Sequence, residues 1–147
     1  MTTALDVKDL LDMSSSELDD LFRASPAGEI PDGEAEGTVL VAPGTSLSEP
    51  AAKIVHFVAW QGKVFDREEG ELRNEILPFG LKAVRAKVYK DESWLDGKQS
   101  IVLDYSGTSL VAHWIRDEIR LVAPGKYLGI VYWEHKKILD FALEFPA

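Results

Sequence analysis

The pattern of hydrophobic and polar residues changes from a helical period near the start of the chain to a mostly alternating one afterwards. Residues 4–24 carry apolar side chains at helical spacing. The clearest apolar face is formed by Leu18, Leu21 and Phe22. Ser14 with Glu17 three residues later makes a capping box, so we expect the helix to restart there. Segment 25–37, rich in proline and glycine, predicts a loop or an irregular lead-in to the first strand.

From residue 38 onward, apolar residues recur mostly at every second position, as is typical of β-strands. Asp96-Gly97 is a dipeptide that favours a tight hairpin turn. The expected strands are 38–42, 53–60, 63–65, 82–90, 100–107, 110–122, 127–133 and 138–145. Short strands at hairpin spacing predict a mainly β protein that forms a single antiparallel up-and-down β-barrel.

The length of 147 residues fits one domain, residues 1–147, with an N-terminal helix over 1–24 and a barrel over 38–147. We expect the helix to cap one end of the barrel. Closure removes exposed strand edges, and about eight strands leave room for packed side chains or one small ligand. A helix-plus-sheet arrangement of cystatin-like or hot-dog type is the alternative, although it calls for a longer central helix.

The acidic composition and the lack of cysteine exclude several classes of function. The net charge is −9, which disfavours binding to nucleic acid or to an anionic membrane surface. The chain has no cysteine, so disulfides and zinc–thiolate sites are excluded. We see no signal peptide and no apolar run of about 20 residues, and therefore expect a cytoplasmic protein.

The segment 110–122 concentrates titratable residues, and its alternation divides them between two faces. The more apolar face, predicted to point inward, holds Val111, His113, Ile115, Asp117, Ile119 and Leu121. The opposite face holds Arg116, Glu118 and Arg120, and we expect it to be solvated. His113 and Asp117 lie about 13 Å apart along a strand, too far to form a dyad. An inward Asp117 could bind a ligand's polar group or form a structural ion pair.

The rest of the sequence offers few candidates for a metal, cofactor or catalytic site. The three histidines lack the spacing of a metal site, so we predict no metal and no cofactor, although haem would need only one histidine. Nucleophile-elbow, P-loop and dinucleotide-binding motifs are missing from the sequence. The many tryptophans and tyrosines fit either core packing or an aromatic-lined cavity.

Short motifs resemble known bacterial domains. The segment 60–65, WQGKVF, is similar to part of the uncharacterised GXWXG-type domain, although the G-x-W-x-G element itself is absent here. The segment 117–129, DEIRLVAPGKYLG, resembles part of the calycin-like domain that follows it, with 82–89 and 101–105 at its preceding strands. The resemblance implies a calycin-like, or lipocalin-like, barrel of unassigned role and carries over no catalytic residue.

These observations together predict that the barrel binds a small, mostly hydrophobic molecule. The residues expected to line or close the cavity are His56, Trp60, Arg85, Tyr105, His113 and Asp117. One alternative is a cofactor-independent cyclase or isomerase, with Asp117 or His113 as acid or base. Another is a structural module that dimerises through an exposed sheet face. The sequence leaves open whether the protein is an enzyme, and also whether it forms a homodimer.

Overall fold

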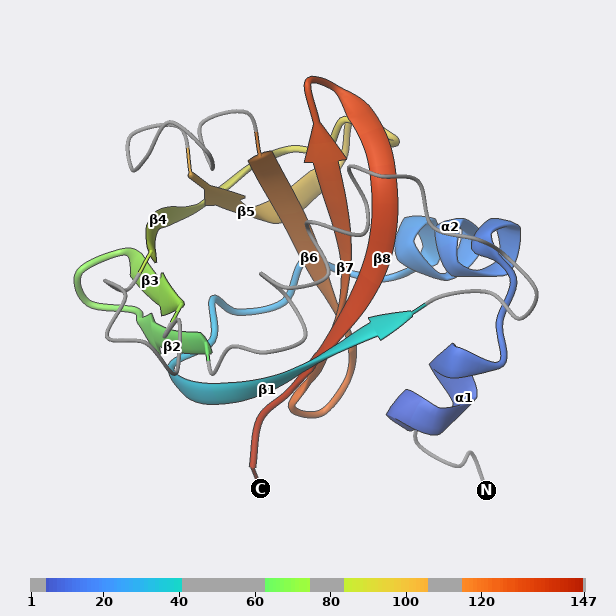
Figure 1. Ribbon diagram of the computed structural model, residues 1–147, viewed down its shortest axis with the longest axis horizontal. Coiled ribbons are helices and arrows are strands. Elements are labelled where there is room, and N and C mark those ends of the chain that lie inside the picture. Colours follow the sequence, from blue (N-terminus) through green and yellow to red (C-terminus); the bar gives the residue numbers. More distant parts are fainter. Residues whose placement is uncertain (1–4, 41–62, 75–83, 106–114, 147) are drawn as a thin grey trace.

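A computed structural model describes residues 5–40, 63–74, 84–105 and 115–146 (Figure 1). Two helices precede a closed antiparallel barrel in which strands β1 to β8 pair in chain order and β8 returns to β1. The elements are α1 (Val7–Leu11), α2 (Ser15–Ala24), β1 (Gly33–Leu40), β2 (Lys63–Asp66), β3 (Glu71–Asn74), β4 (Val84–Glu92), β5 (Gln99–Asp104), β6 (Ile115–Ala123), β7 (Lys126–Trp133) and β8 (Lys136–Glu144). The predicted fold class, an up-and-down β-barrel with an N-terminal helical segment, is confirmed.

The helix restart lies where the capping box predicted it. The Ser14 hydroxyl accepts a hydrogen bond from the Glu17 backbone N–H at 3.1 Å, and Glu17 accepts one from the Ser14 N–H at 3.1 Å. A second box, formed by Asp6 and Asp9, begins α1. The two boxes satisfy N–H groups that the first turn of a helix leaves without backbone partners.

The first strand begins earlier than the sequence suggested. Residues 33–37, GEAEG, were expected to be a loop or an irregular lead-in to the first strand but form the first part of β1. Ala35 is buried while Glu34 and Glu36 are exposed, so this segment alternates as a strand does. Its glycines and small apolar residue gave no β-propensity signal. The predicted strand 53–60 lies outside the described residues.

The barrel interior is lined by alternate side chains from all eight strands. The interior cluster includes Phe65, Leu72, Val88, Ile101, Leu103, Ile119, Val131, Phe141 and Leu143. A Cβ atom at Gly129 of β7 would overlap the ring of Phe141 on the neighbouring β8. The absence of a side chain at Gly129 therefore lets the Phe141 ring lie across the interior.

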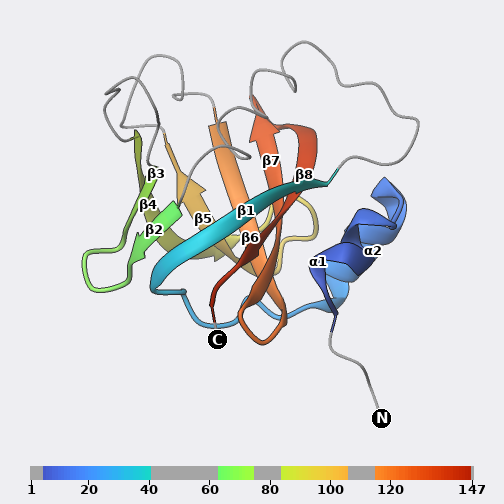
Figure 2. The ribbon, with the colours of Figure 1, turned by 60° about the horizontal axis from the view of Figure 1, so that its bottom comes forward.

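Residues 25–32, between α2 and β1, pass beneath one end of the barrel (Figure 2). The backbone N–H of Leu121 donates to the Pro26 carbonyl at 3.0 Å, and the Tyr127 hydroxyl donates to the Glu29 carbonyl at 2.8 Å. Ala27 and Ile30 pack into the interior cluster. The rings of Phe65 and Tyr127 both lie against Phe145, at centroid distances of 5.5 and 5.6 Å. This end of the barrel is consequently closed.

The helices lie against the outer wall of the barrel, and the expectation that they cap an end is wrong (Figures 1 and 2). A second apolar cluster joins the helices to outward-facing residues of β1, β7 and β8: Leu10, Leu18, Phe22, Leu40, Leu128, Ile130, Tyr132 and Ala142. The apolar stripe of α2 therefore finds its partner on the outside of the sheet. Among the described residues, no helix is long and apolar enough to cross a bilayer.

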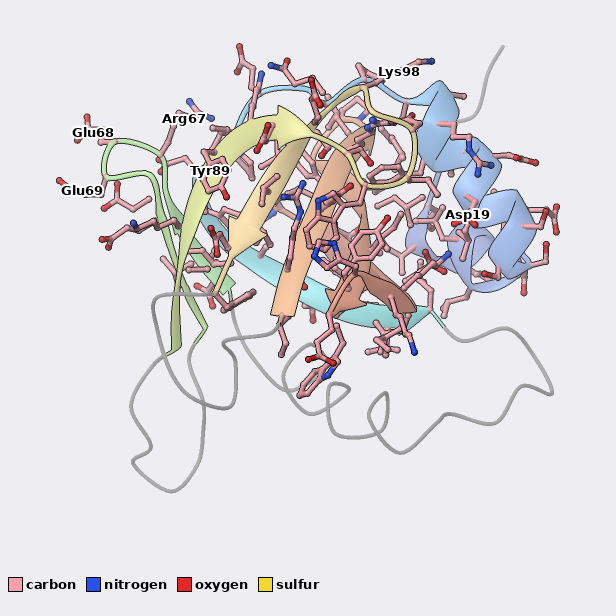
Figure 3. The ribbon with its side chains drawn as sticks, turned by 90° about the horizontal axis from the view of Figure 1, so that it is seen from above. Asp19, Arg67, Glu68, Glu69, Tyr89 and Lys98 are labelled. Carbon is pink, nitrogen blue, oxygen red and sulfur yellow. The ribbon has the colours of Figure 1, made fainter. Side chains whose placement is uncertain are left out.

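The charged turn between β2 and β3 faces solvent. Glu68 and Glu69 are exposed and point away from the barrel (Figure 3). Two further turns, at Asp96-Gly97 and at Glu134-His135, join β4 to β5 and β7 to β8. Glu134 and His135 adopt positive φ angles of 49° and 70°, which the tight hairpin requires.

Candidate functional site

Asp117 lies on the interior face of β6, as the alternation predicted. Its cross-strand neighbours are Leu103 on β5 and Val131 on β7, and both belong to the interior cluster. Residues directly opposite one another in an antiparallel pair project to the same face of the sheet. Asp117 is only 2% exposed. The structure thus places a carboxylate in an apolar stretch of the interior wall.

This carboxylate lies toward the end of the barrel opposite the segment 25–32. Ile115 begins β6, and Asp117 is the next residue of that strand to face inward. Tyr105 follows the last residue of β5, is 4% exposed and belongs to the same interior cluster. The register pairs Asp104 with Arg116, so Tyr105 comes one position beyond that pair. Two of the predicted site residues, Tyr105 and Asp117, therefore lie in one region of the interior.

The other predicted site residues cannot be placed in the same way. His56, Trp60 and His113 lie outside the described residues. Arg85 belongs to β4 and pairs with Arg73 of β3, and its description is confined to the backbone. Their contribution to a cavity stays a prediction.

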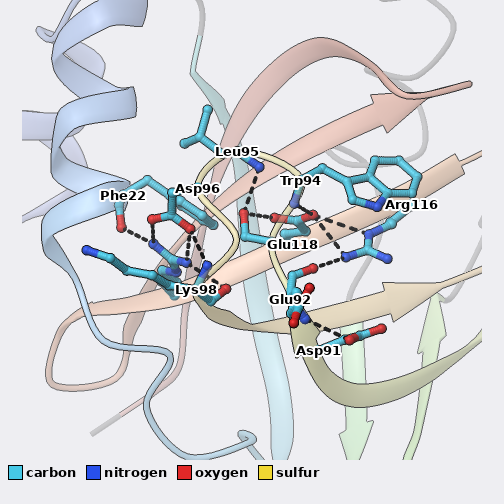
Figure 4. Close-up of polar contacts among 11 residues, drawn as sticks. Phe22, Asp91, Glu92, Trp94, Leu95, Asp96, Lys98, Arg116 and Glu118 are labelled. Atoms are coloured by element: carbon cyan, nitrogen blue, oxygen red, sulfur yellow. Dashed lines mark hydrogen bonds and ion pairs between the residues drawn. The ribbon is translucent and has the colours of Figure 1, made fainter.

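The opposite face of β6 is not solvated, and that expectation is wrong. Glu118 and Arg120 are both fully buried. The turn after β4 folds over this face, and α2 reaches it from the other side (Figure 4). Alternation identified which residues share a face, but it could not show that another part of the chain would cover them.

Glu118 organises the turn that covers it. Its carboxylate accepts hydrogen bonds from the Ser93 hydroxyl at 2.6 Å and from the Trp94 N–H at 2.9 Å. Two guanidinium nitrogens of Arg116 donate to the same carboxylate at 3.2 and 3.1 Å. The indole of Trp94 lies over the Arg116 guanidinium and stacks on His135. With its lone pairs taken up by these donors, Glu118 has a structural role.

Arg120 is fixed just as closely. Its guanidinium donates to both carboxylate oxygens of Asp96 at 2.7 Å and to the Phe22 carbonyl at 2.8 Å (Figure 4). A further bond reaches the Lys98 carbonyl at 3.1 Å. The hydrogen bond from Arg120 holds the pKa of Asp96 below its usual range. This pair ties β6 to the β4–β5 turn and to the end of α2.

The comparisons with known proteins support the fold and leave the activity open. A crystal structure of a protein from Thermomonospora curvata has a similar fold. The match has a TM-score of 0.61 and 14% sequence identity, and it covers 92% of this chain and 90% of that one. No protein-family model matches the sequence, and no curated protein does. At this identity the likeness concerns the fold alone.

The described residues also limit the chemistry of the site. Within them, no group of three or more histidine, aspartate or glutamate side chains is arranged to hold a metal ion. A carboxylate on an apolar wall can instead accept hydrogen bonds from a ligand or exchange a proton with it. Of the two acidic side chains on β6, Asp117 faces the interior and Glu118 faces the β4–β5 turn.

Proposed function

We propose that the protein binds a small, largely apolar molecule inside the barrel, with Asp117 receiving its polar group. The observation that carries this proposal is a 2% exposed carboxylate on the interior wall, flanked across the sheet by Leu103 and Val131. Its carboxyl group offers polar atoms on an otherwise apolar wall, and a few polar groups in an apolar pocket are what orient a bound small molecule.

The direction of access follows from the closed end of the barrel. Residues 25–32 and the rings of Phe65, Tyr127 and Phe145 fill one end. The ring of Phe141 occupies the interior beside Gly129. A ligand would therefore reach Asp117 from the other end, where β5 ends and β6 begins.

The carboxylate also favours one class of ligand. An ionised carboxylate accepts hydrogen bonds and donates none. A ligand that presents an ammonium or hydroxyl group would be attracted to Asp117, whereas a second carboxylate would be repelled. We therefore expect small apolar amines or alcohols to bind in preference to carboxylic acids with the same hydrocarbon part.

We also propose the alternatives that the sequence left open. Cyclase or isomerase chemistry would use the same carboxylate as acid or base, and so would be tested at the same residue. Membership of the calycin-like domains, a cytoplasmic location and homodimerisation stay predictions as well.

A ligand panel tests the proposal directly. Thermal shift and tryptophan fluorescence would be measured with amines, alcohols and carboxylic acids that share one hydrocarbon part. The wild-type protein should respond most to the amine or alcohol, and Asp117→Asn should weaken amine binding at least tenfold. Asp91→Asn, which changes an exposed carboxylate on β4, is the matched control and should bind as the wild type does.

Two results would contradict the proposal. One is that no compound changes the melting temperature or the fluorescence. The other is that Asp117→Asn and the wild type bind the amine equally well. Circular dichroism of Asp117→Asn would show whether lost binding reflects lost folding.

A further inference from the structure

A lysine shared by two carboxylates lies where α2 meets the outer wall of the barrel. The Lys137 ammonium on β8 is 3.0 Å from Asp140 Oδ1 and also donates to Asp19 Oδ1. Asp19 lies on α2 (Figure 3). It reaches the Ser15 hydroxyl of the same helix at 3.3 Å. The cluster thus connects the first turns of α2 to β8 by charge.

The surroundings of Asp140 are largely apolar. Its side chain is 6% exposed. Across the sheet it faces Leu40 on β1 and Ile130 on β7, which belong to the apolar cluster beneath the helices. Besides Lys137 on its own strand, the described titratable groups that act on it are Asp19 on α2 and Tyr132 on β7.

The charges in this cluster do not balance. With both carboxylates ionised, two negative charges share one positive charge in a partly buried interface. Burial is the largest effect and raises the pKa of Asp140, Lys137 lowers it, and the negative charge of Asp19 raises it, so that the pKa lies at about 6. Asp140 therefore changes charge close to neutral pH, whereas an ordinary aspartate titrates near pH 4.

We propose that the Asp19–Lys137–Asp140 cluster is a proton-dependent attachment for the N-terminal half of α2, tighter when Asp140 is protonated. Detaching this part of α2 would admit water to Asp140, which would then release its proton more readily. The docked state consequently binds the proton more strongly than the detached state does. By linkage, lowering the pH through about 6 favours docking, and raising it loosens the helix.

The other end of α2 is held by a group that keeps its charge. Arg120 donates to the Phe22 carbonyl in the last turns of α2 and is paired with Asp96. Arginine stays protonated throughout this pH range. The proposed response is therefore confined to the first turns of α2, and the segment 25–32 that closes the barrel should keep its place.

Hydrogen exchange of the α2 amides tests the proposal. Protection factors, which correct for the intrinsic pH dependence of exchange, would be compared at pH 5 and pH 7.5. We expect amides in the first turns of α2 to be about threefold to tenfold better protected at pH 5, and amides near Phe22 to change little. Asp140→Asn, which mimics the protonated side chain, should show the higher protection at both pH values.

The matched control is Asp20→Asn, because Asp20 is on the same helix but exposed and paired only at the surface with Arg23. It should keep the pH response of the wild type. The proposal is overturned if protection in wild-type α2 is the same at both pH values, or if Asp140→Asn responds to pH as the wild type does. If Asp140→Asn does not fold, the carboxyl ¹³C titration of Asp140 in Asp19→Asn decides: its midpoint should fall below that of the wild type, and an unchanged midpoint would refute the coupling to α2.

Discussion

Two adjacent acidic residues of β6, Asp117 and Glu118, show how strongly the environment decides the role of a carboxyl group. Asp117 faces the barrel interior, while Glu118 faces the β4–β5 turn and is bonded by Ser93, Trp94 and Arg116. Both carboxylates are buried, but Glu118 is covered by the turn after β4 whereas Asp117 lies on the interior wall. Period-two alternation predicted that they would point in opposite directions. It could not predict that both sides of this strand would be covered.

Arg120 offers a test of the structural role given to the outer face of β6. Arg120→Met would leave Asp96 and the Phe22 carbonyl without their guanidinium partner. We expect a loss of about 3 kcal/mol in the free energy of unfolding, measured by urea denaturation. Arg23→Met, which removes an exposed arginine of α2, should cost less than about 1 kcal/mol. Equal losses in the two variants would show that the buried Arg120–Asp96 pair contributes no more to stability than the exposed Arg23–Asp20 pair does.

Tyr89 gives a pH-dependent prediction on the same side of the barrel. Burial, together with its hydrogen bond to Asp104 at 2.8 Å, raises the pKa of Tyr89 to about 12. A raised pKa means that the folded state favours the neutral phenol, so ionisation above pH 10 should destabilise the fold. The difference between ultraviolet titrations of the wild type and Tyr89→Phe should isolate this midpoint. A midpoint near 10 would contradict the described environment of Tyr89.

At the scale of elements, the sequence correctly predicted the helices and turns that are marked by a local motif, such as a capping box or a turn dipeptide. The capping box of α2 and the Asp96-Gly97 hairpin lie where they were expected. The start of β1 was missed because GEAEG has the composition of a turn, and its strand conformation depends on pairing with β2 and β8. The short β3 was not among the expected strands, and it too is specified by pairing, in this case with β2 and β4.

The cap of α2 can be tested at this scale. Ser14→Ala removes the hydroxyl that accepts from the Glu17 N–H, so we expect a loss of about 1 kcal/mol in the free energy of unfolding. Ser16→Ala, at an exposed position inside the same helix, should be neutral or slightly stabilising. If Ser16→Ala were as harmful as Ser14→Ala, the loss could not be assigned to the cap.

At the scale of the whole molecule, two apolar clusters share the barrel wall. One lines the interior, and the other joins the helices to the outer face of β1, β7 and β8. For β6, the sequence predicted the inward positions of Ile115, Ile119 and Leu121, because strand alternation specifies which side chains share a face. It did not predict the position of the helices, because an apolar helical stripe can pack equally well across an end or along a wall.

The candidate site was predicted only in part. The inward position of Asp117 followed from alternation, and Tyr105 belongs to the same interior cluster. The buried pair of Arg120 with Asp96 was missed, since it joins a strand to a turn 24 residues away. The sequence feature that could have indicated this pair is the row of charged residues on one face of a strand whose other face is apolar.

The central claim is that a ligand binds inside the barrel beside Asp117. Methyl chemical shifts measured by NMR during titration with an apolar amine test this claim most directly, because the two clusters report on the two sides of the same wall. The account predicts that the methyl signals of Leu103 and Val131 shift, while those of Leu128 and Ile130 on the outer face do not. Shifts confined to Leu128 and Ile130 would place the ligand under the helices and contradict the account.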